Sequence, residues 1–481
     1  MDELFELLQI PNTEPISKVI HILTQGKDKT RIFDLAEKQL DPSKHDIFNP
    51  ILRRDKWQEK PNQDGVKDED GNVEMSKQLV KVNRIGIAYQ KLIVNKTKAF
   101  LFGNTPKLKS NPVTEEEKIV LKAVERVLHD IKESSFNRKV AGAISSYTEG
   151  GEIWWFQKKD EKHSNYGFPT DIVLKAKVLS PKENELFYSY TDSLGDLLVF
   201  TRSYCMQIDG KDTQYYDVYT SKKNYRFQQI GSEITIDPKY PIENKLEKIP
   251  AVFGEQDIVE WADVQWSIDR LEVLLSNHAE VNDRNAYPIL AIKGEVKSFI
   301  EKGPGGAVEL ENGADMAYVS WDNATASVKL EIENLIKYIH MITQTPNISF
   351  EEVKSMGALS GTALKMLFLD AHLKVMEKRE IYDEYLQRRI NIIKKAIGVL
   401  NPKLKTAADN LIIEPEIIPF MVENEKEQVE IALLKNGGKA LESHEKSVKN
   451  WQGQDTEDYE KIKAEEKEFN SLEYFNPTNV E

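Results

Sequence analysis

The sequence predicts an α+β fold in which helical and strand-rich regions follow one another along 481 residues. Two observations support this prediction. Short segments rich in aromatic and β-branched residues alternate with turn residues between about 152 and 230, which is typical of an antiparallel meander. Two long stretches, residues 257–283 and residues 362–397, contain no Gly or Pro and carry apolar residues at helical spacing. We therefore expect antiparallel sheet combined with long helices.

In the first half of the chain, Pro11 and Pro15 are expected to divide residues 1–40 into short amphipathic helices. Turn signals within 50–80 predict a hairpin there. Three helices are predicted at Asn83–Leu101, Glu115–Ser134 and Phe136–Thr148. A single meander of about six strands should follow, at Glu152–Gln157, Ile172–Val178, Leu186–Tyr190, Leu197–Ile208, Gln214–Thr220 and Asn224–Ile230.

The second half predicts a helix at Asp257–Asp283, a small Gly-rich α/β module at Arg284–Ser327 and a second helix at Val328–Gln344. Two helices separated by a small module can lie side by side as a stalk, with the module at its tip. A loop then leads into a long helix that Asn401-Pro402 should end. Short strands at Leu411–Ile413 and Glu416–Phe420, a charged helical region broken at Gly437-Gly438, and a helix at Asp455–Phe469 complete the expected order.

Composition and charge exclude several classes of protein. The formal net charge is −14, whereas a protein that grips nucleic acid by counterion release needs clustered Lys and Arg. The acidic balance still allows a protein that nucleic acid slides past. No apolar run approaches the length of a membrane span, and the N-terminus lacks the pattern of a signal peptide. The single cysteine, Cys205, excludes an intrachain disulfide and fits a reducing compartment.

The motifs of common active sites are missing from the sequence. No two of the eight histidines have the spacing of a metal pair. An acidic stretch ending at Gly71 resembles a calcium loop, but Val66 and Lys77 occupy ligand positions, so a solvated hairpin is the better interpretation. The Gly303–Gly306 run is not followed by the Lys-Ser/Thr of a phosphate-binding loop. We therefore predict no catalytic residue, no metal ligand and no cofactor.

Four groups of residues occur in a characteristic order: Asn83–Pro106 with its Phe-Gly-x-x-Pro ending; Ser180-Pro181 followed by Asp192–Arg202; Ile249–Val252 followed by Trp266–Leu271; and Thr345-Pro346 followed by Ser360–Lys365. Together they resemble the portal (connector) proteins of tailed bacteriophages, in the branch found in long-tailed siphophages. The four groups resemble, in turn, that family's N-terminal helix, its wing sheet, the entry to its stem helix, and its tunnel loop with the long wing helix.

The resemblance implies a ring-forming portal fold. In its terms, residues 1–256 and 362–420 form the wing, 257–283 and 328–344 the two-helix stem, 284–327 the clip, 345–361 the tunnel loop and 421–481 a helical crown. It also implies a ring of twelve subunits at one capsid vertex of the virion, assembled in the host cytoplasm. Double-stranded DNA would pass through the channel, driven by a terminase. The terminase large subunit, a head-completion or adaptor protein, and the major capsid and scaffolding proteins are the implied partners, with no membrane.

Two groups of candidate site residues follow from these assignments. The expected tunnel-loop residues that face DNA are Asn347, Ser349, Lys354, Ser355 and Gly357. Lys354 is the basic residue of that stretch and is expected either to touch phosphates or to pair with the nearby glutamates. The expected docking residues of the clip for terminase are Lys297, Lys302, Gly303, Pro304, Gly305 and Gly306.

Two other functions are the alternatives to a portal. A DNA-processing enzyme, such as a nuclease or terminase subunit, needs clustered carboxylates for metal or a P-loop, and the sequence shows neither. A capsid or tail adaptor without a channel is the second alternative. The mass of the purified assembly separates a ring of about twelve copies from a monomeric enzyme.

Overall fold

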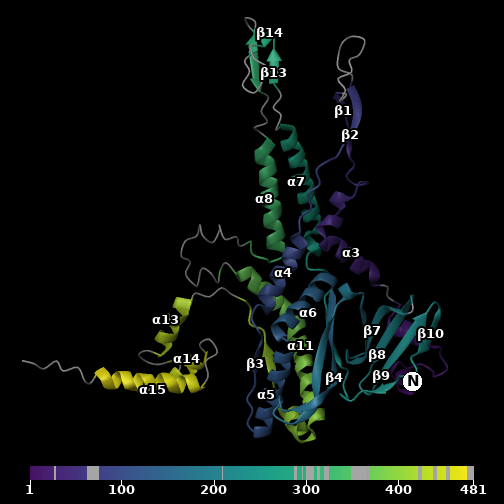
Figure 1. Ribbon diagram of the computed structural model, residues 1–481, viewed down its shortest axis with the longest axis vertical. Coiled ribbons are helices and arrows are strands. Elements are labelled where there is room, and N and C mark those ends of the chain that lie inside the picture. The colour runs from purple at the N-terminus through teal and green to yellow at the C-terminus, as the bar shows by residue number, and fades with distance from the viewer. Residues whose placement is uncertain are drawn as a thin grey trace, which may run out of the picture. The chain divides into compact units, whose positions relative to one another are not determined.

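The computed structural model describes residues 1–26, 29–61, 75–208, 210–285, 290–294, 296–299, 308–310, 315–318, 324–347, 366, 368–420, 425–436, 441, 443–450 and 456–473. The chain divides into two compact units (Figure 1). The first unit comprises Met1–Asn347 and Asp370–Phe420, and the second comprises Ile348–Leu369 and Met421–Glu481. Helices and strands are both abundant, which confirms the α+β prediction. No helix in the described part of the chain is long and apolar enough to cross a membrane.

The N-terminal segment forms short helices and a hairpin, as predicted. Pro11 and Pro15 lie between α1 (Asp2–Leu7) and α2 (Ile16–Leu23), and both helices pack their apolar faces on the larger sheet. After α3 (Thr30–Leu40) and the short 3-10 turns η1 (Pro42–Lys44) and η2 (Asp46–Phe48), β1 (Lys56–Pro61) pairs antiparallel with β2 (Met75–Val80).

Three helices follow the hairpin, and the first starts later than predicted. They are α4 (Tyr89–Phe102), α5 (Glu115–Asp130) and α6 (Glu133–Tyr147). The prediction that α4 begins at Asn83 is wrong. The backbone amide of Ile85 donates to Ser276 Oγ and that of Ile87 donates to Glu272 Oε1, so these side chains hold the segment out of the helix. The start of α5 is fixed by a capping box between Thr114 and Glu117.

The predicted six-strand meander is in fact divided between two sheets. In the smaller sheet, β4 (Glu149–His163) lies between β5 (Thr170–Leu179) and β12 (Ala251–Glu255). The chain leaves it at the turn η3 (Pro181–Glu183) and Asn184, whose φ is 57°. The larger sheet then runs in sequence order through β6 (Leu186–Thr191), β7 (Leu197–Ile208), β8 (Lys211–Tyr219), β9 (Lys223–Ile230) and β10 (Glu233–Ile236), with β11 (Ile242–Glu243) also paired to β9.

The predicted helix at 257–283 also starts later, at α7 (Gln265–Asn285), after the 3-10 turn η4 (Ala262–Val264). The residues before it are fixed by other contacts. The buried indole of Trp261 donates to Gln39 Oε1, and the amide of Glu260 donates to the Ser145 carbonyl. These contacts hold the segment in an irregular conformation, which the apolar spacing of the sequence did not reveal.

Between α7 and α8 (Ala324–Ile342), the elements that the structure describes are strands. Two antiparallel pairs are present, β13 (Leu290–Lys293) with β16 (Asp315–Tyr318), and β14 (Val296–Phe299) with β15 (Val308–Leu310). The two strands predicted here are confirmed with shifted ends. In the described part of this region, helix is not seen, so the α/β description of the module is not confirmed.

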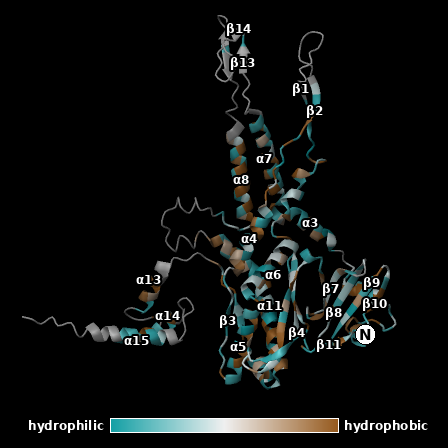
Figure 2. Cartoon of the chain, viewed as in Figure 1, coloured by the Kyte–Doolittle hydropathy of each residue, from teal (hydrophilic) through white to brown (hydrophobic). Residues whose placement is uncertain are grey.

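The largest core surrounds α11 (Leu369–Leu400), which packs with α5, α6 and the smaller sheet. Figure 2 shows hydrophobic residues recurring along α6, α8 and α11. Asn401 ends the long helix as predicted, because its side chain accepts from the Lys403 amide at the start of η5 (Pro402–Leu404). After α12 (Lys405–Asn410), one strand, β17 (Glu414–Glu416), pairs with β3 (Lys107–Lys109) in place of the two predicted strands. Leu411 and Ile413 are instead buried in the core.

The C-terminal part of the second unit is helical, as predicted. It contains α13 (Glu425–Asn436), α14 (His444–Asn450) and α15 (Thr456–Glu473). A small hollow between them is lined by apolar residues that include Val429, Leu433 and Val448. Residues of all three helices line this hollow.

Candidate functional site

The helices α7 and α8 form a pair whose lower half is built into the first unit. Ile268 and Leu271 of α7 are buried with Leu335 and Ile339 of α8 in one apolar cluster. At the surface of the pair, Arg270 donates to Glu331 Oε1 from both Nε and Nη2, at 3.0 and 2.9 Å. Figure 1 shows the two helices side by side. The pair is thus an extension of the core and not a separate helical hairpin.

A row of hydrogen bonds and ion pairs joins α7 to the N-terminal segment. His45 and Glu272 are both buried, and His45 Nδ1 lies 2.6 Å from Glu272 Oε1. One helical turn later, Ser276 accepts from the Ile85 amide, and a turn beyond that Glu280 pairs with Arg53 and Lys56. The acceptors on α7 therefore repeat every four residues along one face. The extended segment before α4 runs along that face.

The loop that follows α8 is anchored where it begins. Thr345 is buried, its hydroxyl is 2.8 Å from that of Thr343, and its carbonyl lies 2.9 Å from Nδ1 of the buried His340. Lys96 of α4 donates to the Pro346 carbonyl at 2.6 Å. The last described residues before the loop are consequently fixed by α4 and by the end of α8.

The first turns of α11 are fixed by a buried carboxylate. Glu260 lies 2.5 Å from Lys374 Nζ and 2.9 Å from Lys378 Nζ, and Lys378 also donates to Gln256. Burial works to raise the pKa of Glu260, but the two lysines outweigh it, and its pKa is lowered. The carboxylate therefore stays charged and joins the segment before α7 to α11.

A second buried ion pair lies deeper, between β4 and α11. Arg389 donates to both carboxylate oxygens of Glu152, with Nη2 at 2.6 Å from Oε2. Glu152 also accepts from the Tyr385 hydroxyl and from the Trp154 indole. Arg389, Glu152, Tyr385 and Trp154 are all buried, so these hydrogen bonds lie in a region of low dielectric constant.

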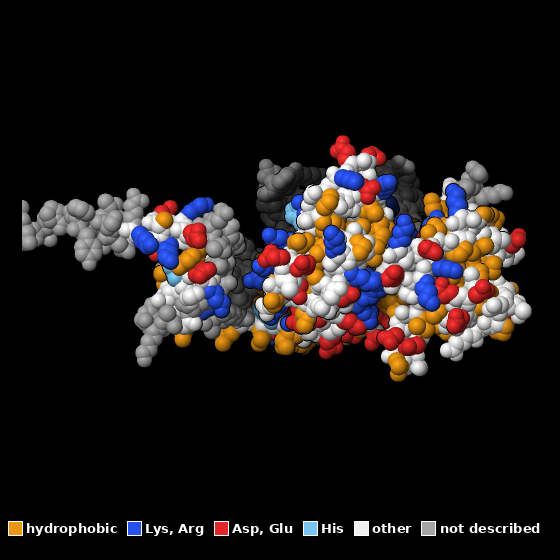
Figure 3. Space-filling model, turned by 90° about the horizontal axis from the view of Figure 1, so that it is seen from below, with side chains coloured by type: hydrophobic (Ala, Val, Ile, Leu, Met, Phe, Trp, Pro, Cys, Tyr) orange, Lys and Arg blue, Asp and Glu red, His pale blue; other side chains and the backbone are white. Residues whose placement is uncertain are grey.

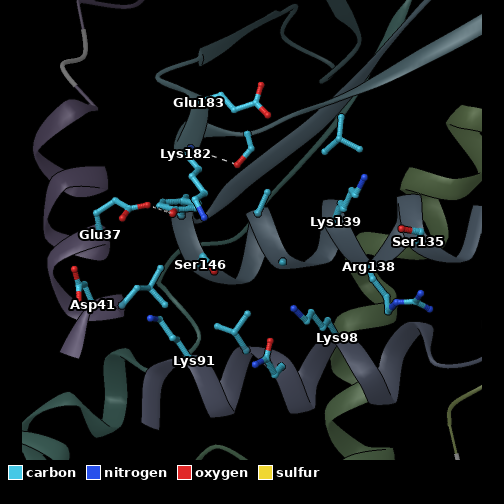
Figure 4. Close-up of a pocket in the computed structure, with 18 residues that line it drawn as sticks. Glu37, Asp41, Lys91, Lys98, Ser135, Arg138, Lys139, Ser146, Lys182 and Glu183 are labelled. Atoms are coloured by element: carbon cyan, nitrogen blue, oxygen red, sulfur yellow. Dashed lines mark hydrogen bonds between the residues drawn. The ribbon is translucent and has the colours of Figure 1, made fainter. Parts of the chain in front are cut away.

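A groove with a basic lining runs beside α6 (Figure 4). It is a hollow of about 780 Å³ between α3, α4, α6 and the end of β5. Lys98 of α4, Arg138 and Lys139 of α6, and Lys182 of η3 are among the residues that line it. The sequence analysis did not identify this groove, because its basic residues come from segments far apart in the chain. The face of the molecule in Figure 3, by contrast, mixes basic and acidic side chains.

Most of the predicted site residues lie outside the described residues. In the expected tunnel loop, Asn347 is described and exposed, whereas Ser349, Lys354, Ser355 and Gly357 fall outside. In the expected clip, Lys297 belongs to the strand β14, and Lys302 and Gly303–Gly306 fall outside. The structure therefore neither brings these two groups together nor separates them. Within the described residues, no group of three or more His, Cys, Asp and Glu side chains could hold a metal ion.

The residues that fix the ends of the loop were missed by the sequence analysis. Lys96 and Glu260 look like ordinary surface charges of helices in the sequence. The one available signal was that Glu260 stands in the sequence directly between the apolar residues Val259 and Trp261. A carboxylate in such surroundings needs a cationic partner.

Three comparisons with known proteins bear on these features. Residues 45–471 match the family model described as "Phage portal protein, SPP1 Gp6-like". No curated protein matches the chain.

Among solved structures, the chain is similar to the neck of a native gene transfer agent particle computed with C12 symmetry, with 11% identity, a TM-score of 0.35 and coverage of 74% of this chain and 86% of that one. It is also similar to the neck of an empty particle computed with C6 symmetry, with 11% identity, a TM-score of 0.40 and the same coverage. These two are likenesses only. The family match spans the N-terminal hairpin, both sheets, the helix pair and α11, and on that basis the chain belongs to the phage portal protein family.

Proposed function

We propose that this protein forms a dodecameric ring at one vertex of a phage capsid and serves as the channel for DNA packaging and ejection. Portal proteins are structural, and we assign this chain no catalytic activity of its own. Its partners are double-stranded DNA in the channel, the terminase large subunit, a head-completion or adaptor protein, and the major capsid and scaffolding proteins. The mature location is the virion, after assembly in the host cytoplasm.

We assign the parts of the chain to the parts of a portal subunit as follows. Residues 1–256 and 362–420 serve as wing, 257–283 and 328–344 as stem, 284–327 as clip, 345–361 as tunnel loop and 421–481 as crown. In this scheme Asn347, Ser349, Lys354, Ser355 and Gly357 face the DNA. Terminase docks on the clip at Lys297, Lys302 and Gly303–Gly306.

The observation that carries the proposal, beside the family match, is the way the α7–α8 pair is held. One end is fixed by His45–Glu272 and by the anchored start of the loop at Thr345. The other end leads into two short antiparallel strand pairs. Two-stranded pairs are barely stable alone in water, so they need neighbouring chains for support. A rigid stem with incomplete strands at its tip fits a subunit that is completed by its neighbours in a ring.

The mass of the purified full-length protein tests the proposal. We expect a closed assembly of about twelve chains, with an axial channel in electron micrographs. Particles of monomer mass only, at all concentrations tested, contradict the ring. A closed assembly without a channel supports an adaptor instead.

A further inference from the structure

The groove beside α6 contains positive charge that the described part of the chain does not neutralise. Its three carboxylates are already engaged: Glu37 accepts from Tyr147, Asp41 from Ser43, and Glu183 pairs with Lys177. Among the described residues, no carboxylate oxygen lies within ion-pair distance of Lys98, Arg138, Lys139 or Lys182. A second hollow, of about 710 Å³, shares Ser135 and Arg138 with the groove, and its lining adds Lys107 and Lys132 together with Glu125 and Glu133.

The charges in the groove are close enough to disfavour one another. Lys98 is partly buried, and its pKa is lowered, first by that burial and then by the nearby Arg138. Arg138 itself donates only to the Phe102 carbonyl and the Ser134 hydroxyl in the described structure. An anion that entered the groove would therefore relieve an unfavourable arrangement of like charges.

The opposite side of α6 faces α11 and β12. The groove residues Arg138, Gly142 and Ser146 lie on one face of the helix, and Asn137 and Ile144 lie on the other. Asn137 accepts from Arg389 of α11, and a Cβ placed on Gly254 of β12 would lie 2.9 Å from Ile144 Cδ1. The groove and the α11–β12 surface are therefore on opposite sides of the same helix.

That second surface carries acidic and apolar side chains side by side. Lys378 of α11 bonds to Gln256 and pairs with Glu260, which brings the segment after β12 against the first turns of α11. Ile258 and Leu373 are 51% and 46% exposed. We call five exposed residues at the end of β12, in the segment after it and in the first turns of α11 the acidic patch: Glu255, Asp257, Ile258, Leu373 and Glu377.

We propose that the groove beside α6 binds the acidic patch of a second copy of this chain. A ring requires a heterologous contact, in which two different surfaces on roughly opposite sides of each subunit meet. The groove and the acidic patch meet this requirement and have complementary charge. The proposal rests on the ring of the proposed function and names one of the surfaces that builds it.

The lining of the groove favours a protein partner over a nucleic acid. Glu37, Asp41 and Glu183 interrupt the cations of the lining, so it offers no continuous row of positive charge to the closely spaced phosphates of a duplex. Leu40 and Val178 in the same lining are partly exposed and offer apolar area, and the acidic patch supplies apolar side chains to match it. A few carboxylates surrounded by apolar groups are therefore the better fit.

A charge-swap experiment in full-length protein tests this contact. The groove variant is Lys98→Glu with Lys139→Glu, and the patch variant is Asp257→Lys with Glu377→Lys. Each alone places like charges across the contact, so we expect the concentration at half-assembly to rise by at least about tenfold. An equimolar mixture of the two variants restores attraction at every interface of an alternating ring. Mass photometry of each variant and of the mixture measures the assembly.

The controls separate this proposal from the ring itself. The variant Lys159→Glu with Lys162→Glu makes the same charge change on exposed residues of β4, away from both surfaces, and should assemble like wild type. Circular dichroism melting checks that each double variant is folded. If a double variant melts below wild type, a single charge reversal at the exposed Lys139 or Glu377 takes its place.

Two results overturn the contact while leaving the ring intact: both variants assemble normally, or the mixture stays dissociated while wild type forms rings. Wild-type protein that is monomeric throughout overturns the proposed function as well. Rings from wild type and from the mixture, but not from either variant alone, establish the contact.

Discussion

His45 and Glu272 form a buried pair in which the histidine donates from both ring nitrogens. Nδ1 lies 2.6 Å from Glu272 Oε1, and Nε2 lies 2.7 Å from the Gln39 carbonyl. Both partners are acceptors, so the ring is a charged imidazolium here. Burial works to lower the pKa of His45, but Glu272, the Gln39 carbonyl and the nearby Asp269 outweigh it, and the pKa is raised.

This pair predicts a pH-dependent stability. Because the folded-state pKa of His45 is raised, its contribution is fully present below about pH 6.5 and is lost as pH rises through the folded-state pKa. The variant His45→Gln should lose ~3 kcal/mol at low pH and less at high pH. Urea unfolding of both proteins between pH 5 and pH 9, at about one-unit steps, measures the difference. A difference that does not change with pH would mean that His45 is neutral in the folded protein.

The ion pair of Glu152 and Arg389 predicts a strong and asymmetric mutational effect. Glu152→Gln leaves a buried guanidinium without its counter-charge and should destabilise the protein by about 3–5 kcal/mol. Replacing both residues, as Glu152→Leu with Arg389→Met, should cost less than either single change because no buried charge remains. Thermal melting of the two single variants and the double variant decides this. Additive losses would show that the pair does not act as a unit.

Lys96 predicts a defect in packaging without a defect in assembly. Lys96→Met keeps most of the aliphatic stem but removes the donor to the Pro346 carbonyl, so the start of the loop loses one anchor. Rings should form normally, while the amount of DNA packaged per particle falls. Lys96→Arg, which keeps a donor, should package close to the wild-type amount. Equal packaging by all three proteins would show that this anchor has no role in the channel.

The proposed tunnel loop is tested by Lys354→Glu. If this side chain touches phosphates as DNA passes, reversing its charge should slow packaging or reduce DNA retention, with ring assembly preserved. Packaging rate and packaged length in a terminase-driven assay are the measurements. If neither changes, the lysine has no DNA contact, and pairing with the nearby glutamates becomes its assigned role.

The proposed clip is tested by replacing residues 300–307 with a short Gly-Ser linker. The strand pairs β13–β16 and β14–β15 are outside the replaced residues and should still form. We expect rings of normal mass that no longer retain terminase in a pull-down. Undiminished terminase binding would place the docking surface elsewhere.

The sequence allowed the helices and strands to be predicted but not their connections. Apolar spacing gave α5, α6, α8 and the end of α11 at Asn401 closely, because these elements bury one face against the core. It failed for α4 and α7, where side chains distant in sequence, such as Glu272 and Gln39, bond to the backbone or to Trp261. Local spacing carries no information about such partners.

The division of the strands between two sheets was missed for a related reason. The turn at Pro181–Glu183 looks like an ordinary hairpin connection in sequence, yet it sends the chain to a different sheet. The likeness to portal proteins did give the family, because it used the order of four residue groups over most of the chain. The groove beside α6 was not predictable in this way, since its cations come from three separate segments.

The free, exposed thiol of Cys205 on β7 is the one cysteine of the chain. A maleimide dye will therefore attach once per polypeptide, with no competing position to remove beforehand. In a fully labelled particle, the number of bleaching steps equals the number of polypeptides. Single-molecule fluorescence can thus count the copies in intact particles, using the natural sequence without substitution.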